Sequence, residues 1–231
     1  MTLHANKFFY VLVFVLFFNN FSTAHVQHYS ELNNITFEIY RNNKHIGEHS
    51  FTFKTYPVKK ELHVISKINF KIKKLGVVLY KYFAEGTEVF KDGSLIKFNS
   101  TTDQNGKQKY ANLELKEEIF LIDGSSFKGK TTTDHMLGTW WNHNLVKAPA
   151  QISAVSGRVI YQKVHFLGKE TIKIHDKTYN TLHFKFLSVD KKTPKDKKLN
   201  TDVWYDEKSL NWVKASFDKK GQWEYRLLSI K

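Results

Sequence analysis

Apolar and polar side chains alternate residue by residue over most of this chain, and this period of two constrains its fold more than any other feature. The clearest example is 62–73, where Lys67, Lys71 and Lys73 share one face and mostly apolar residues occupy the other. A strand with one buried face shows this pattern because successive side chains point to opposite faces. Similar runs recur at 35–41, 50–56, 78–90, 95–101, 108–115, 119–122, 159–166, 171–175, 179–187, 202–205, 211–217 and 223–230. The pattern predicts an all-β protein.

Short turn dipeptides separate these runs. Asp92-Gly93, Asn105-Gly106 and Asp123-Gly124 each follow a stretch of alternation. Asn, Asp and Gly adopt the positive φ that tight hairpins need. The regular spacing therefore predicts antiparallel neighbours in an incomplete barrel or a strongly curved sheet. Residues 25–231 are enough for a single β-rich domain with a sizeable core.

One segment, 132–148, breaks the alternation. It contains "DHMLGTWWNHNL" (134–145), in which several apolar side chains recur at a spacing of four. Thr133 or Asp134 is a suitable N-cap for a helix that would end before Pro149. We therefore expect one short helical insertion of one or two turns, placed between two strand-rich halves.

The first residues have the composition of a secretory signal. Lys7 precedes an apolar run at 8–18, and Ser22-Thr23-Ala24 supplies a small-residue cleavage site. The run is shorter than the roughly 20 apolar residues that a spanning helix needs. These features predict a cleavable signal peptide at 1–24 and an exported, periplasmic protein that is not transmembrane.

The chain is strongly basic and has no cysteine, with a formal net charge of +14. Disulfides and thiolate metal sites are therefore excluded. One interpretation of the charge is that Lys67, Lys71 and Lys73 contact an anionic membrane surface; the other is an ordinary solvated surface. Only three residues are arginine, the side chain best suited to bidentate phosphate recognition. No nucleic-acid partner is predicted.

Asp134, His135 and His143 are the candidates for metal-dependent or hydrolytic chemistry, since imidazole and carboxylate groups together bind transition metals. The two histidines are eight residues apart, and the segment has no second carboxylate. The alternative is that Asp134 caps the helix and both histidines are ordinary, partly exposed residues. No catalytic residue, metal ligand or cofactor is predicted, and an enzyme remains the alternative.

Three further histidines attract attention through their position. His25 would become the N-terminus after signal cleavage, and its α-amine and imidazole would then form a chelating pair suited to copper. The alternative is an unstructured leader. His45 and His49 flank the first hairpin turn, where we expect both to be exposed to solvent.

Aromatic side chains are abundant at the inward positions of the predicted strands. They predict either a packed core or an apolar groove for an acyl chain or similar lipid-like ligand. Binding of such a ligand, or of a cell-envelope partner, is the favoured function, and a structural module that docks through its strand edges is a further alternative. The predicted ligand-binding residues are Trp140, Trp141, Asn142, Trp204, Tyr205, Phe70 and Tyr82.

Five stretches carry a resemblance to a known family. They are "IYRNNKHIGEH" (39–49), "TDQNGKQ" (102–108), "GTWWNHNL" (138–145), "DVWYDEKSLNWVKASF" (202–217) and "YRLL" (225–228). In this order they resemble a family of exported bacterial proteins described as domain of unknown function 6134. The resemblance implies an exported, β-rich single domain and no catalytic residue. By analogy of fold alone, it is also distantly similar to half-barrels that carry lipids or lipoproteins across the periplasm.

Overall fold

The computed structural model describes residues 28–190 and 198–231, in which fifteen strands form one sheet. The first half of the chain forms β1 (Asn34–Arg41), β2 (Lys44–Tyr56), β3 (Glu61–Lys74), β4 (Val77–Lys91), β5 (Ser94–Gln104), β6 (Lys107–Lys116), β7 (Ile119–Gly124) and β8 (Lys128–Thr132). The second half forms β9 (Met136–Leu137), β10 (Ala150–Ile152), β11 (Val159–Ile174), β12 (Lys177–Ser188), β13 (Asn200–Asp206), β14 (Trp212–Asp218) and β15 (Gln222–Ile230). Three short 3-10 helices are η1 (His28–Glu31), η2 (Pro57–Lys59) and η3 (His143–Lys147).

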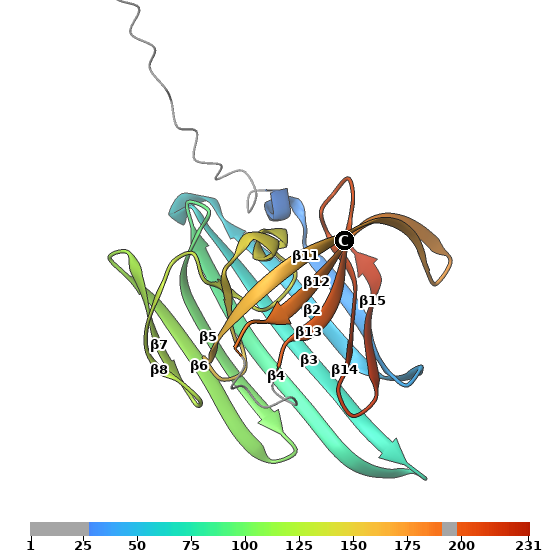
Figure 1. The fold of residues 1–231 in the computed structure, drawn as a ribbon. Coiled ribbons are helices and arrows are strands. Elements are labelled where there is room, and N and C mark those ends of the chain that lie inside the picture. Colours follow the sequence, from blue (N-terminus) through green and yellow to red (C-terminus); the bar gives the residue numbers. More distant parts are fainter. Residues whose placement is uncertain (1–27, 191–197) are drawn as a thin grey trace, which may run out of the picture.

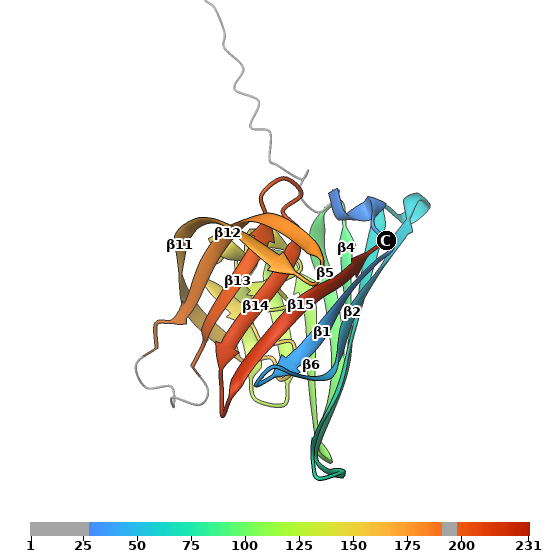
Figure 2. The same cartoon turned by 90° about the vertical axis from the view of Figure 1, so that its right-hand side faces the viewer.

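The strand order is β8-β7-β6-β5-β4-β3-β2-β1-β15-β14-β13-β12-β11-β10-β9. The first and last long strands, β1 and β15, pair with each other in the middle of the sheet, while β8 and β9 form its two open edges. The sheet bends so far that β11–β15 lie opposite β3–β6 (Figures 1 and 2). The predicted all-β fold, an incomplete barrel or strongly curved sheet, is confirmed.

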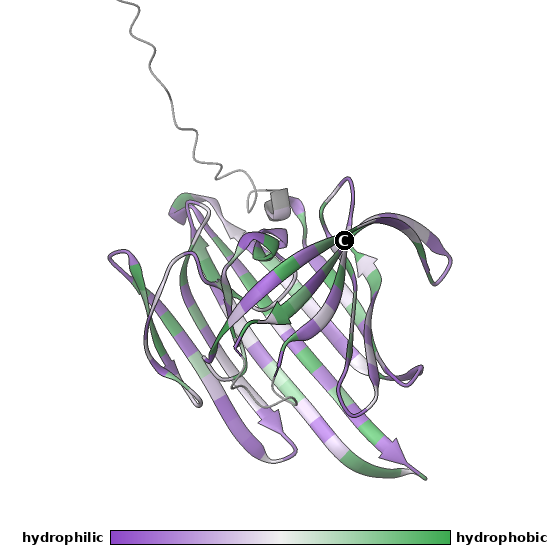
Figure 3. Ribbon diagram, in the orientation of Figure 1, coloured by the Kyte–Doolittle hydropathy of each residue, from purple (hydrophilic) through white to green (hydrophobic). Residues whose placement is uncertain are grey.

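Alternation of hydropathy decides which face of each strand points inward, and it is visible as bands along the ribbons in Figure 3. On β1, Ile35, Phe37 and Ile39 are fully buried, while the residues between them are only partly buried. The buried side chains of both halves of the sheet pack into one large core cluster on the concave side. Burial of these aromatic and aliphatic groups is the main force that holds the curved sheet together.

β-Bulges supply much of the curvature. The register shifts in six of the strand pairs, and each shift bends and twists the bulged strand. Gly47 lies beside the bulge between β1 and β2, facing the backbone of β3. A Cβ atom at Gly47 would lie 2.1 Å from the carbonyl oxygen of Asn69, so only glycine permits this approach.

The segment 132–148 differs from its predicted structure. Its helical part is the 3-10 helix η3, which starts at His143 and is capped by the Asn142 side chain, whose Oδ1 accepts a hydrogen bond from Asn144 N at 3.1 Å. The prediction of a cap at Thr133 or Asp134 was wrong, because the chain there turns inward and forms β9. β9 pairs in parallel with β10, and the other strand pairs of the described residues are antiparallel.

Several predictions concern residues outside this structure. The signal peptide at 1–24 and the copper site at His25 lie outside the described residues.

Within residues 28–190 and 198–231, no helix has the length and apolar character required to span a membrane.

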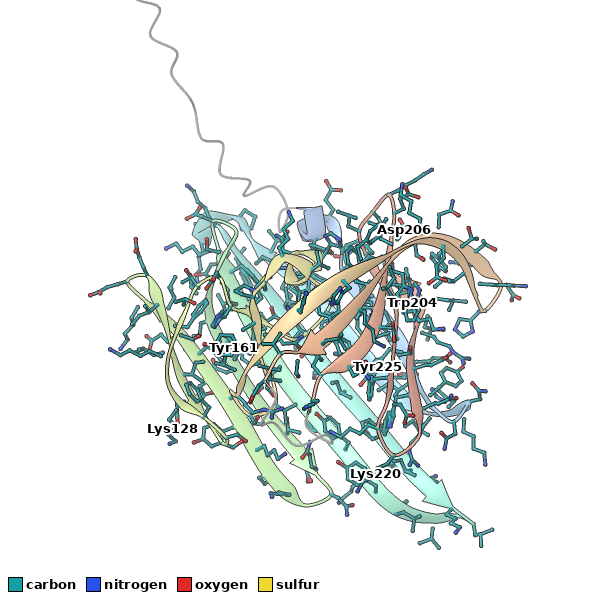
Figure 4. All side chains as sticks on the ribbon, in the orientation of Figure 1. Lys128, Tyr161, Trp204, Asp206, Lys220 and Tyr225 are labelled. Carbon is teal, nitrogen blue, oxygen red and sulfur yellow. The ribbon has the colours of Figure 1, made fainter. Side chains whose placement is uncertain are left out.

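The strand edges of the sheet were predicted as docking surfaces. The edge strand β8 carries Lys128 (labelled in Figure 4) and Lys130, and lysines on an edge strand discourage pairing with a further strand.

Candidate functional site

A tight turn at Thr139-Trp140-Trp141 separates the two adjacent tryptophans. Trp141 N donates a hydrogen bond to Thr139 O at 2.8 Å, and Trp140 between them has φ +59°. This is a γ-turn with positive φ at its centre, a rare and strained conformation for a bulky residue. The Tyr205 hydroxyl fixes the turn by donating to Trp140 O at 2.9 Å. The two indoles consequently enter different parts of the interior.

Trp140 lines a partly open hollow on the concave face of the sheet, which we call the inner cavity. This cavity has a volume of about 230 Å³ and is walled by inward residues of β2–β5, by β15, and by the segments 138–140 and 151–155. The Trp140 ring meets Trp212 and Tyr225 edge-on, at centroid distances of 5.4 and 5.8 Å. Tyr225 also lines the cavity and is labelled in Figure 4.

His49 is the unexpected residue of the inner cavity. It occupies an inward position of β2 and is buried, with its ring 4.3 Å from that of Phe51 and 5.8 Å from that of Tyr225. Burial lowers the pKa of His49 to about 3, so the ring is neutral at physiological pH. The prediction that His49 is exposed was wrong; His45, four residues nearer the turn on the same strand, is exposed as expected.

Three of the residues that line this cavity carry four buried polar atoms without a hydrogen-bond partner among the described residues: Nδ1 and Nε2 of His49, Oγ1 of Thr102 and Nε1 of Trp140. A neutral imidazole has one donor and one acceptor, and an indole has one donor. Buried polar groups are nearly always paired, so four unpaired atoms among the lining residues of one cavity call for a specific explanation.

Trp141 is fully buried and belongs to the core. Its ring packs edge-on against Tyr29, Phe53 and Phe90, and its Nε1 donates to Glu88 Oε1 at 2.8 Å. Burial raises the pKa of Glu88 to about 7, although hydrogen bonds from Trp141 and Thr139 act in the opposite direction. Glu88 is therefore a buried carboxyl that exchanges its proton near neutral pH.

A larger pocket opens at the seam between the two edges of the sheet. We call it the seam pocket; it has a volume of about 780 Å³, and Glu88, Asp134 and His135 contribute to its lining. Thr139 lines both the seam pocket and the inner cavity. The Asp134 carboxylate accepts a hydrogen bond from the Thr132 hydroxyl, and His135 Nδ1 forms a hydrogen bond with the Thr131 hydroxyl.

The structure does not bring Asp134, His135 and His143 together. The His143 ring packs against Tyr205 and Phe184, away from the seam pocket. No group of three or more His, Asp or Glu side chains in the described part of the chain is arranged to hold a metal ion.

The other predicted ligand-binding residues are dispersed. Asn142 caps η3 and lines the seam pocket, Tyr82 lines the inner cavity, and Phe70 stacks on Tyr82 at 4.8 Å outside that lining. Trp204 (Figure 4) does not line either pocket: its ring stacks on His183 at 4.2 Å, and Lys214 Nζ lies over it at 4.9 Å.

Tyr205 is predicted to act as the support of the γ-turn. Replacing Tyr205 with Phe removes the hydroxyl that holds Trp140 O and leaves the ring in place. We expect the free energy of unfolding to fall by about 1 kcal/mol, the usual contribution of one buried hydrogen bond. Urea denaturation measures the change; Tyr161→Phe, at an exposed tyrosine of β11 (Figure 4), is the matched control and is expected to be neutral. Equal stability of the Tyr205 variant and the wild type would contradict this role.

Sequence reasoning missed Glu88 and underestimated His49, yet both left a signal. Each occupies an inward position in a strand whose neighbouring inward residues are apolar or aromatic, such as Phe90 beside Glu88 and Phe51 beside His49. A polar residue in the apolar register of an alternating strand is the pattern that would have identified them.

The curved open sheet and its enclosed interior define a β-barrel-like protein. The chain is similar in structure to the β-barrel-like protein of domain of unknown function DUF1849 from Brucella abortus, with a TM-score of 0.59, 8% identity, and coverage of 87% of this chain and 98% of that one. A protein with a YmcC-like fold from Bacteroides fragilis aligns at a TM-score of 0.35 and 11% identity, covering 86% of this chain and 94% of that one. Comparison of the sequence with curated proteins gives no match.

Residues 37–228 match the model of the family described as Domain of unknown function (DUF6134), and the chain belongs to that family. The resemblance seen in the sequence is thereby confirmed. Four of the stretches that carry it meet at the inner cavity, to which they contribute His49, Thr102, Trp140 and Tyr225.

Proposed function

We propose that this protein is exported to the periplasm and binds an amphipathic, lipid-like ligand in the inner cavity. The observation that carries the proposal is the set of four unpaired polar atoms, two on His49, one on Thr102 and one on Trp140, among the lining residues of a single cavity. Leaving a buried polar group unpaired costs about 1–3 kcal/mol, and a ligand that pairs with these atoms would offset that cost. The positive, apolar and small-residue regions of 1–24 support export.

The remainder of the cavity lining supports a ligand with an apolar part. Ile68, Ala84, Phe98 and Ile160 contribute aliphatic and aromatic surface beside the polar atoms. The volume of about 230 Å³ exceeds that of a few waters at about 30 Å³ each. A polar head near His49 and Trp140, with a short apolar segment along the other lining residues, matches the distribution of the two kinds of surface.

Native mass spectrometry of the protein purified from its own cell envelope is the first test. We expect a bound small molecule that is released by denaturation and that carries both a polar group and an apolar chain. Protein that carries no additional mass, and takes up none when incubated with lipid extract from the same cells, would contradict the proposal.

The second test assigns binding to the inner cavity. His49→Phe removes both ring nitrogens and Trp140→Phe removes the indole N–H, and each is expected to weaken binding of a dansyl-labelled fatty acid about tenfold, equivalent to about 1.4 kcal/mol. Trp212→Phe is the matched control, because Trp212 Nε1 is also buried and unpaired in the described structure but does not line the cavity. Loss of affinity in all three variants alike would place the ligand elsewhere.

A further inference from the structure

One hairpin extends beyond the rest of the sheet. β2 pairs with β3 only as far as Phe70, opposite Gly47, and β5 pairs with β4 only from Tyr82, opposite Gln104. The part of the β3–β4 hairpin between those residues, 71–81, is therefore a two-stranded projection, which Figures 1 and 2 both show extending past the neighbouring strands. At about 3.3 Å per residue, Leu75 stands roughly 15 Å beyond Phe70.

The turn at the end of this projection is chemically unlike other tight turns of the sheet. Its residues, Leu75 and Gly76, have φ of +49° and +81°, and the Leu75 side chain is 96% exposed. The corresponding two-residue turns elsewhere in the sheet are all polar: Asn42-Asn43, Asp92-Gly93, Asn105-Gly106, Glu117-Glu118 and His175-Asp176. Asn, Asp and Gly tolerate this backbone conformation, whereas leucine is unfavourable there. Leu75 thus contributes neither to the turn nor to packing.

Leu75 is the centre of an apolar tip. Val77, Val78 and Leu79 follow it along β4 with exposed fractions of 62%, 46% and 55%. These residues form a continuous apolar run at the outermost point of the molecule, where no other described element covers them. Exposed apolar surface of this kind marks an interaction site.

Lysines surround the apolar tip. Lys71, Lys73 and Lys74 precede the turn and Lys81 follows it, while the sequence from 71 to 84 contains no acidic residue. The carboxylate groups of this region lie at the base of the projection: Glu48 lines a surface pocket with Lys71 and Lys73, Glu85 pairs with Lys67 at 3.4 Å, and Asp103 acts on Tyr80 from β5. An apolar point with a collar of lysines matches the boundary between the acyl chains and the anionic headgroups of a bilayer.

We propose that this hairpin inserts Leu75, Val77 and Leu79 into the surface of an anionic lipid bilayer, with the surrounding lysines at the headgroups. The projection holds the tip away from the body, so only the tip enters the lipid while long lysine stems reach back to the phosphates. Lys71 and Lys73, two of the three lysines for which the sequence predicts a membrane contact, belong to this projection, whereas Lys67 lies in the sheet and is paired with Glu85. This inference is independent of the proposed ligand in the inner cavity.

Sedimentation with vesicles tests the insertion. The wild-type chain is expected to bind vesicles of phosphatidylglycerol and phosphatidylcholine, to bind pure phosphatidylcholine at least tenfold more weakly, and to lose affinity as salt screens the lysines. The triple variant Leu75→Asn, Val77→Thr, Leu79→Thr should bind the anionic vesicles at least tenfold more weakly. Asn suits the turn, so this variant is expected to fold; circular dichroism and urea denaturation check that its body is intact.

Val58→Asn is the matched control. Val58 is 99% exposed and lies beside Lys59 and Lys60 in η2, at the opposite end of β3 from the tip. This substitution is expected to leave vesicle binding unchanged. Absence of wild-type binding, equal binding by the triple variant, or equal losses at Val58 and at the tip would each overturn the proposal. A wild-type dimer in solution that the triple variant dissociates would assign the tip to a second copy instead and would also overturn it.

A single label locates the contact directly. Since the chain has no cysteine, Leu75→Cys and Val58→Cys can each carry one environment-sensitive NBD group. We expect the emission at position 75 to shift to the blue and brighten on adding anionic vesicles, and the emission at position 58 to stay unchanged. An unchanged signal at 75 in protein that sediments with the vesicles would overturn the insertion.

Discussion

Glu88→Gln is expected to be more stable than the wild type above pH 7 and to approach it below pH 4.5. Burial raises the pKa of Glu88 from 4.5 to about 7, so the folded protein retains a proton that the unfolded chain releases in this range. Unfolding then releases a proton, and the contribution of Glu88 to stability falls as the pH rises from 4.5 to 7. This pKa shift corresponds to a loss of about 3 kcal/mol in the free energy of unfolding at high pH. Glutamine avoids this loss because it does not ionise.

The gain at high pH depends on keeping the bond to Trp141. Glutamine still offers a carbonyl oxygen to Trp141 Nε1, whereas Glu88→Leu would leave that indole N–H unpaired in the core. Urea denaturation at pH 5 and pH 8 measures the difference between variant and wild type. Glu85→Gln, at a half-exposed position of the same strand, is the control for the substitution itself. A difference from wild type that stays constant between the two pH values would contradict a buried, protonated Glu88.

His49→Phe is expected to give the opposite slope. Burial lowers the pKa of His49 from 6.5 to about 3, so below pH 6.5 the unfolded chain binds a proton that the folded chain excludes. The contribution of His49 to stability is therefore present above pH 6.5 and is lost as the pH falls toward 3. At pH 5 the free energy of unfolding of the wild type has fallen by about 2 kcal/mol through this proton uptake. The His49→Phe variant does not lose this stability, because phenylalanine does not bind a proton.

The two groups offset each other in the wild type. On acidification from pH 7 to pH 5, Glu88 stabilises the folded state by about 2 kcal/mol while His49 destabilises it by a similar amount. Relative to wild type, His49→Phe should gain stability over this range and Glu88→Gln should lose it. His45→Phe, at an exposed position of the same strand, controls for the added ring. Two variants that shift in the same direction would show that one of these environments is assigned incorrectly.

These opposing buried groups also bear on the proposed ligand. Thr139 lines both pockets and its side chain is hydrogen-bonded to Glu88, while the next residue, Trp140, lines the inner cavity together with His49. A ligand that pairs with His49 and Trp140 would settle against the same γ-turn that positions Trp141 on Glu88. Ligand binding is therefore expected to increase stability at any pH where the folded protein binds it.

Particular residues show how far sequence reasoning reaches. The alternation predicted the inward face of β1 to β6 because burial along a strand follows directly from its period of two. Sequence reasoning failed at His49, because the usual exposure of a histidine near a hairpin was given more weight than the inward register of this residue. It also failed at 132–148, where spacings of four suggested a helix although Met136 and Leu137 are strand residues and the two tryptophans are the second and third residues of a γ-turn.

The sequence by itself determined the fold class, the family and the apolar face of nearly every strand, because these depend on the local order of residue types. Only the tertiary structure decided which polar residues share a cavity, that Trp140 and Trp141 separate, and that Leu75 lies on a projection. These features depend on which strands end first and on contacts between residues far apart in the chain, such as Tyr205 with Trp140 and Glu88 with Trp141. Pairing over such separations is set by the closure of the whole sheet, and no local pattern encodes it.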